Sequence, residues 1–191
     1  MTIRDRMMPG RNANIAMTKD FVCSIFGSNY ARLFPAPKNI PFLKTGYIER
    51  ECAYDLAKII LEEERVPICV HATAGIGKTT LVNNIEKYLP DGSVVVFYDC
   101  YGGGTYLQPS DSRYECDTAI PQICNSLALE CKTEFLLERR LKESEFFQEL
   151  CIRLEHAVKY VKKISENAII LLIIDAADNC VFAVYAAAKC Q

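Results

Sequence analysis

The stretch from Val66 to Ile85, VPICVHATAGIGKTTLVNNI, is the feature that most constrains the fold. It opens with a short β-rich apolar run, of the kind that forms a strand buried on both faces of a parallel sheet. Small residues, including Gly75 and Gly77, then indicate a bend, and a helical pattern follows Lys78. A strand, a glycine-containing bend, a Lys-Thr pair and a helix in this order are typical of a loop that binds phosphate.

Elementary electrostatics explains this spacing. Backbone N–H groups at a helix N-terminus lack partners and carry partial positive charge, and small residues let them approach a phosphate closely. Lys78 adds a full charge toward the β- and γ-phosphates, and the Thr79 hydroxyl can bind Mg²⁺. The predicted phosphate contacts are Thr73, Ala74, Gly75, Ile76, Gly77, Lys78, Thr79 and Thr80. The alternative is a plain strand-to-helix turn that contains glycines.

One position departs from the usual pattern of such loops. The consensus has glycine where this chain has Ala72. Alanine is compatible with the loop if its φ is negative, and costs about 1 kcal/mol or more if its φ is positive.

A second apolar run, NAIILLIID, ends at Asp175. Mg²⁺ prefers hard oxygen ligands, and P-loop enzymes supply an aspartate at the end of a neighbouring strand. Thr79 and Asp175 are therefore the predicted metal ligands. Asp178 is placed to orient or deprotonate an attacking water, so Asp178 and Lys78 are the predicted catalytic residues. The structural alternatives are a helix N-cap for Asp175 and an ordinary turn for Asp178.

The rest of the chain predicts an α/β fold in three layers. Strands are expected at VPICVH, SVVVFYDC and NAIILLIID, which gives a parallel sheet of about three strands. Helices are expected from Thr45 onward, over about 116–132 and over about 135–164. Residues 1–44 include LFPAPKNIPF, whose three prolines indicate an irregular linker or strap, and residues 45–191 are assigned to the partial P-loop domain.

GIGKTTL and LLIIDAADN together resemble the signal-transduction NTPases with numerous domains, the STAND class, and especially their NACHT-like branch. That branch carries an acidic motif D-G-x-D-E, where this chain has Ala176 for the glycine and Asn179 for the glutamate. YIERE is similar to the h-h-G-R-E element of the class, with Glu49 for its glycine. The resemblance implies that Arg50 lies near the bound nucleotide.

The resemblance also implies a larger domain than this chain contains. The class has sheet order 5-1-4-3-2, so a fourth strand inserts between the strand ending at Asp175 and the strand of the phosphate loop. Only Ala176 to Gln191 follows Asp175 here, without a further β run. The sequence is therefore interpreted as an incomplete P-loop NTPase with a gap in its sheet. The alternative is a compact fold in which the first and third strands pair directly.

Composition excludes several classes of function. Net charge is −2, and positive and negative residues alternate in the charged helices, so no nucleic-acid partner is expected. The longest apolar run, Ala168 to Ile174, is far short of a membrane span, so a cytoplasmic protein without a membrane partner is expected. The ten cysteines form no Cys-x-x-Cys pair, and reduced cysteines are favoured over a disulfide. A solvated Arg113 is favoured over one that reaches a phosphate.

The functional hypothesis is ATP binding with Mg²⁺, as the switch module of a STAND-type signalling or defence protein. Hydrolysis is expected to be slow and regulatory if the domain is complete, and this chain alone is expected to be inactive. The resemblance implies a homo-oligomer that forms through domains outside the chain. The alternatives are a small-molecule kinase or phosphotransferase, and an interaction domain that does not hydrolyse nucleotide.

Overall fold

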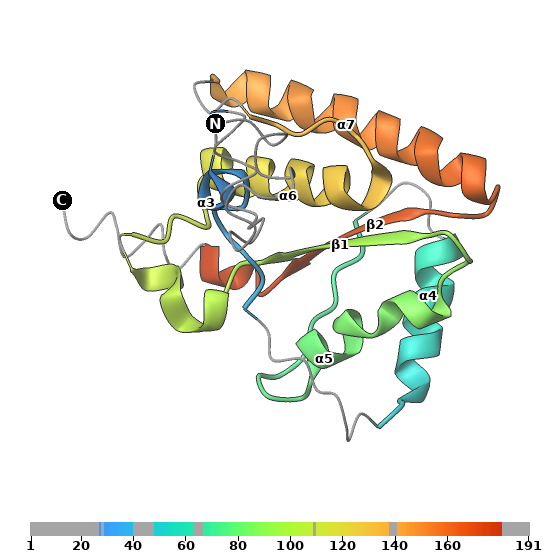
Figure 1. Cartoon of the computed structure of the whole chain (residues 1–191). Helices are drawn as coiled ribbons and strands as arrows, with labels where there is room; N and C mark the ends of the chain where they lie inside the picture. The colour runs from blue at the N-terminus through green and yellow to red at the C-terminus, as the bar shows by residue number, and fades with distance from the viewer. Residues whose placement is uncertain are drawn as a thin grey trace, which may run out of the picture.

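The computed structural model describes residues 27, 29–39, 48–62, 67–108, 110–137 and 141–180, which contain both helices and strands (Figure 1). The elements are α3 (Tyr30–Leu33), α4 (Glu51–Glu62), α5 (Lys78–Asn83), the 3₁₀ helix η1 (Ile85–Tyr88), β1 (Val94–Asp99), the 3₁₀ helix η2 (Gly102–Leu107), α6 (Cys116–Cys131), α7 (Glu143–Ile164) and β2 (Ile170–Asp175). A helical turn at 178–180 follows β2. None of the helices in these ranges combines the length and the apolar character that a membrane span requires.

β1 and β2 form a parallel pair, which confirms the strands predicted at SVVVFYDC and NAIILLIID. The register runs from Val94 opposite Ile170 to Asp99 opposite Asp175. Both strands are rich in β-branched residues, which fit the pleated surface of a sheet. Because the strands are parallel, their carboxyl ends meet at one edge and bring the two aspartates side by side.

The strand predicted at VPICVH is wrong for the part that the structure describes. Residues 67–71 form no strand, and Ile68 and Val70 are exposed. A groove of about 1430 Å³ lies between 67–72 and β2, and α4 contributes to its lining. A strand needs a neighbouring backbone about 4.8 Å away, and the groove separates these two segments. The alternative in which this segment pairs directly with β2 is therefore wrong, and the sheet in the described residues consists of β1 and β2.

The core lies on the other side of the sheet, where α6 and α7 cover it (Figure 1). Its fully or nearly fully buried members are Ala36, Val96, Tyr98, Cys100, Ile123, Leu127, Cys131, Ala157, Val161 and Ala168. The helix predicted at 116–132 is confirmed as α6. The helix predicted at 135–164 starts later, at Glu143, where Lys142 and Glu145 form a capping box, and 132–137 is not helical.

The described part of the N-terminal region is a strap packed on the core. Ala36 is buried and its N–H donates to the Gln122 side chain at 3.0 Å. Arg113 donates to the carbonyls of Pro37, at 3.3 Å, and Asp99, at 2.9 Å. The expectation of a solvated Arg113 is wrong, because this side chain is buried by the contacts that hold the strap. Residues 40–47, with the predicted start of the next helix, lie outside the described residues, and α4 begins at Glu51.

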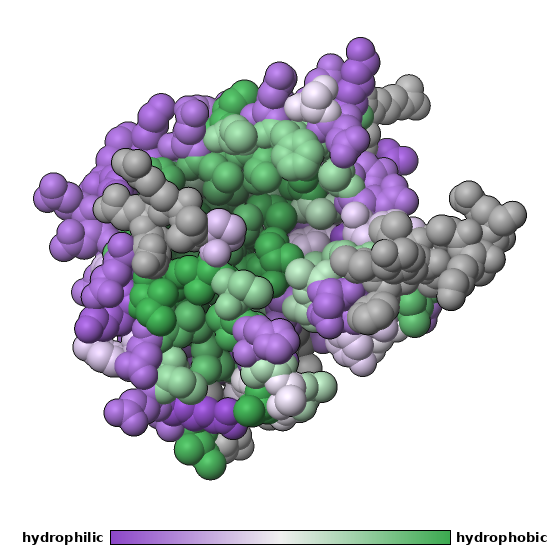
Figure 2. Space-filling view, turned by 180° about the vertical axis from the view of Figure 1, so that it is seen from behind, coloured by the Kyte–Doolittle hydropathy of each residue, from purple (hydrophilic) through white to green (hydrophobic). Residues whose placement is uncertain are grey.

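Seen from behind, hydrophobic residues gather over the middle of the molecule, with hydrophilic residues around them (Figure 2). Several large apolar side chains are exposed in the described ranges, and four of them line the groove: Leu61, Ile68, Val70 and Ile174. One side of the sheet is thus packed and the other is open.

Candidate functional site

The predicted phosphate loop is a tight turn that leads into α5. Gly75 and Gly77 have φ of 79° and 95°, which is the left-handed region that glycine adopts at little cost. Gly77 is the residue immediately before the helix. Outside glycine, only Lys132 and Ala176 have positive φ among the described residues. Ala72 therefore fits its position without backbone strain.

Lys78 joins the two ends of this loop. Its Nζ donates to the carbonyl oxygen of Ala72 at 2.6 Å and to that of Thr73 at 3.1 Å. These acceptors are neutral, and a phosphate oxygen is a stronger acceptor for an ammonium group. The lysine is thus held over the loop by bonds that an incoming anion can replace.

Thr79 and Asp175 are brought into direct contact from positions 96 residues apart. The Thr79 hydroxyl donates to Asp175 Oδ2 at 2.8 Å. Burial raises the pKa of Asp175, and nearby Asp99 adds to this, whereas the Thr79 hydrogen bond and the charge of Lys78 oppose it. A partly desolvated carboxylate of this kind gains from a bound cation.

The oxygen pair fits Mg²⁺. Adjacent ligands of an octahedral Mg²⁺ with bonds of 2.0–2.1 Å are about 3 Å apart, close to the observed separation. Both atoms are hard oxygen donors, and Mg²⁺ commonly takes one or two protein ligands while waters and phosphates fill the rest. No group of three or more His, Cys, Asp or Glu side chains suited to a metal occurs in the ranges that the structure describes.

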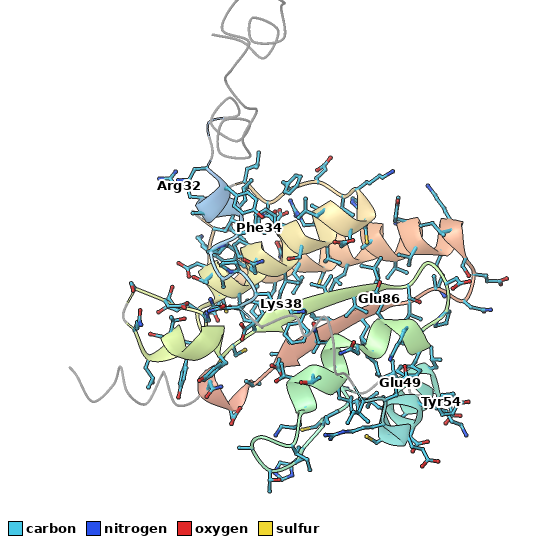
Figure 3. All side chains as sticks on the ribbon, turned by 60° about the horizontal axis from the view of Figure 1, so that its bottom comes forward. Arg32, Phe34, Lys38, Glu49, Tyr54 and Glu86 are labelled. Carbon is cyan, nitrogen blue, oxygen red and sulfur yellow. The ribbon has the colours of Figure 1, made fainter. Side chains whose placement is uncertain are left out.

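Arg50 reaches the same loop from the residue before α4. Its Nη1 donates to the Ile76 carbonyl at 2.7 Å, and its guanidinium lies 3.6 Å from the point where a Cβ on Gly77 would stand. The neighbouring Glu49 forms an ion pair with Lys87 at 2.5 Å, which fastens this segment to η1 (Figure 3). The structure therefore places Arg50 against the predicted phosphate contacts.

The remaining predicted site residues differ in their surroundings. Asp178 is exposed and lines the groove together with Lys78 and Asp175, and its carboxylate accepts no hydrogen bond from another residue in the described ranges. Thr80 is partly buried, and its carbonyl accepts from Asn84 at 2.7 Å. Thr73, Ala74 and Ile76 are exposed at the surface of the loop.

A second cavity, of about 590 Å³, contains residues that the sequence did not single out. It is lined by Lys38, Asn39, Thr79, Asp99, Tyr101, Gly103, Asp175 and Ala176. The predicted metal ligands Thr79 and Asp175 therefore border this cavity. The only sequence signal for Asp99 was its place at the end of a strand, next to a run of glycines.

Asp99 has a structural part in this cavity. Its buried carboxylate accepts from the backbone N–H groups of Tyr101 and Gly102, both at 2.9 Å, and from that of Asn39 at 3.0 Å. These bonds fix the glycine run after β1 and the end of the strap, so its lone pairs are engaged by the fold.

Lys38 is carried into the cavity by the strap (Figure 3). Its ammonium lies 4.3 Å from the Phe97 ring centre and donates to the Asn83 side chain on α5. Burial lowers the pKa of Lys38, and the negative charges of Asp99 and Asp175 oppose the shift. Sequence reasoning missed it because the strap pattern gave no sign of where the segment docks.

A scan against protein-family models finds no match to this chain. A search among curated proteins finds no significant match either.

Proposed function

We propose that this chain binds a nucleoside triphosphate, ATP by its resemblance to the STAND class, together with Mg²⁺. The 2.8 Å contact between the Thr79 hydroxyl and Asp175 carries the proposal. It joins the residue after the loop lysine to the end of a distant strand, which is the pairing that a P-loop metal site requires. The fold assignment that goes with it is an incomplete three-layer P-loop domain.

Each side chain has a defined task in this proposal. Lys78 exchanges two carbonyl acceptors for phosphate oxygens, and the loop N–H groups donate to the same phosphates. Thr79 and Asp175 hold the metal ion, whose charge offsets that of the phosphates. Arg50 stabilises the loop through the Ile76 carbonyl, with its guanidinium next to Gly77.

Binding rather than turnover is the activity that the site supports best. Asp178, the candidate for orienting water, is exposed in the wide groove, and its neighbour is Asn179 where the motif has glutamate. A water at this point is open to solvent, which weakens the electrostatic stabilisation of a transition state. Any hydrolysis is therefore slow, as suits a conformational switch in which nucleotide occupancy is the signal.

The test is a titration of the purified full chain with ATP, with and without Mg²⁺, by calorimetry. We expect saturable, Mg²⁺-dependent binding that Lys78→Ala weakens at least about tenfold, about 1.4 kcal/mol. Lys58→Ala is the matched control, since Lys58 is an exposed lysine on α4. Circular dichroism confirms that each variant is folded.

Two outcomes contradict the proposal. One is a folded wild-type chain that shows no binding of ATP at millimolar nucleotide, and the other is equal affinity in Lys78→Ala. Turnover that appears only when a small-molecule acceptor is added would instead favour a phosphotransferase.

A further inference from the structure

Two cysteines meet where the two strands end. Cys100 follows β1 and is buried, and Cys180 lies in the helical turn after β2 and is partly exposed. Cys180 packs against the buried cluster to which Cys100 belongs. The backbone N–H of Cys100 also donates to the Asp175 carbonyl at 3.1 Å, which holds the end of β1 against the start of this turn. Both cysteines are free thiols.

The core explains why these thiols stay together. Cys100 belongs to the buried cluster formed with α6 and α7, and Cys180 packs against that cluster. Tyr98 belongs to the same cluster. Burial is the main cause of its raised pKa, and electrostatic interactions with Cys100 and Cys180 raise it further. The pair therefore lies at the boundary between a dry core and solvent.

The two thiols differ in reactivity. Interaction with the Cys100 thiol lowers the pKa of Cys180 to about 7, whereas the same interaction, together with burial, raises the pKa of Cys100. Burial raises the pKa of Cys124 to about 11 and also raises that of Cys131. The thiolate is the nucleophilic form of cysteine, so Cys180 combines thiolate character with access to solvent.

We propose that Cys180 is a modification site for hydroperoxides, and that Cys100 resolves the oxidised form by making a reversible disulfide with it. The observation that carries this is the packing of the partly exposed Cys180 against the buried cluster that contains Cys100, at the adjoining ends of β1 and β2. An exposed, reactive thiol beside a second cysteine is the arrangement of a redox-sensing pair. The proposal does not depend on nucleotide binding.

The chemistry balances in two steps. With hydrogen peroxide, the Cys180 thiolate attacks one oxygen, an S–O bond forms, the O–O bond breaks, and the released hydroxide takes up a proton to become water; an organic hydroperoxide releases the corresponding alcohol instead. The Cys100 thiol then attacks the Cys180 sulfenic acid, an S–S bond forms, the S–O bond breaks, and the Cys100 proton leaves with the hydroxyl as a second water. The cysteine pair loses two electrons and the hydroperoxide gains them; a dithiol reverses the reaction.

A disulfide here would tie the turn at 176–180 to the end of β1. That turn carries Asp178 and contributes Ala176 and Ala177 to the wall of the groove. Oxidation would therefore fix the segment next to Asp175 by a covalent bond to the packed side of the molecule.

The experiment treats the reduced full chain with hydrogen peroxide and maps disulfides by peptide mass spectrometry. We expect a Cys100–Cys180 cross-link as the main product, with loss of two hydrogens, and its reversal by dithiothreitol. In Cys100→Ser, Cys180 should accumulate as a sulfenic acid that dimedone traps. Cys151→Ser is the matched control, because Cys151 is exposed, and should still form the cross-link.

A measurement on the unmutated chain tests the proposal even if the variants fail to fold. Under brief alkylation with iodoacetamide at neutral pH, Cys180 should react at least about threefold faster than the exposed Cys151 or Cys69. A main cross-link that omits either Cys100 or Cys180 overturns the proposal. So does a Cys180 that reacts no faster than Cys151.

Discussion

β1 and β2 have similar apolar sequences and lie side by side, yet their surroundings differ. Val96, Tyr98 and Asp99 of β1 are 2–3% exposed, whereas no residue of β2 is fully buried and Ile174 is 45% exposed. β1 lies within the cluster built with α6 and α7, and β2 borders the groove. Two strands of similar apolar composition can thus differ in burial, because burial depends on which elements pack against each strand.

The two sides of the sheet also differ in their roles: one holds the buried cluster that stabilises the fold, and the other holds candidate site residues. The packed side holds the main buried cluster, which includes Leu127 and Val161. Lys78 and Asp175 stand at the margin of the open side, where they line the groove. Local stability follows buried contacts, so the segments around the groove should open more readily than α6 and α7.

The largest expected loss of stability comes from a substitution on the packed side. Leu127→Ala removes a fully buried side chain from α6 and should lower the free energy of unfolding by about 2–5 kcal/mol. Ile174→Ala, on the open side, is the matched comparison and should cost less than about 1 kcal/mol. Urea unfolding followed by circular dichroism measures both, and equal losses would contradict the division.

Asp175→Asn tests whether the Asp175 carboxylate lowers the stability of the fold while it supports Mg²⁺-dependent ATP binding. Because burial raises the pKa of Asp175, the folded state holds that proton more tightly than the unfolded chain does. The ionised group therefore costs stability, and this cost appears as pH rises through the unfolded pKa to above the folded pKa. At neutral pH the variant should be more stable than wild type, with the difference vanishing in acid.

The same variant should lose Mg²⁺-dependent ATP binding by about tenfold or more, about 1.4 kcal/mol. Thermal unfolding as a function of pH and calorimetric titration give the two measurements. A variant that is destabilised at neutral pH would refute the stability assignment, and unchanged Mg²⁺ dependence would refute the metal assignment.

Ala176→Gly addresses backbone strain next to the site. Ala176 has φ of 56°, and a non-glycine residue there costs about 1–2 kcal/mol. Part of the gain is offset because glycine loses more chain entropy on folding, so we expect stabilisation of about 1 kcal/mol. Ala177 does not have a positive φ, so Ala177→Gly should leave the free energy of unfolding unchanged or lower it. Urea midpoints decide between these outcomes.

The smallest expected effect is a difference in alkylation rate between Cys180, which is partly exposed, and Cys124, which is buried. Because the Cys180 pKa is lowered to about 7, its alkylation rate should rise through neutral pH and level off about one unit above that pKa. Cys124, whose pKa is raised to about 11 by burial, should remain unreactive across the same range. Rates from mass spectrometry between pH 6 and 9 would sharpen the comparison, and parallel profiles would contradict it.

Patterns with local causes could be predicted from the sequence. β1, β2 and α6 follow from apolar periodicity and from breakers at their ends, and the turn before Lys78 follows from its glycines. The contact between Thr79 and Asp175 was also predictable, because a strand-end aspartate and a loop threonine imply a shared metal site. The roles of these residues in binding stay predictions.

Other features depended on partners distant in sequence. A helix satisfies its backbone within itself, but a strand needs a neighbour, so VPICVH could not become a strand across the open groove. Arg113 is buried because the strap passes over it, and Lys38 reaches the acidic residues for the same reason. Cys100 and Cys180 meet because parallel strands bring their carboxyl ends to one edge. The sequence alone determined the local elements and the chemistry they carry, and tertiary packing decided which of those elements are covered, paired or left open.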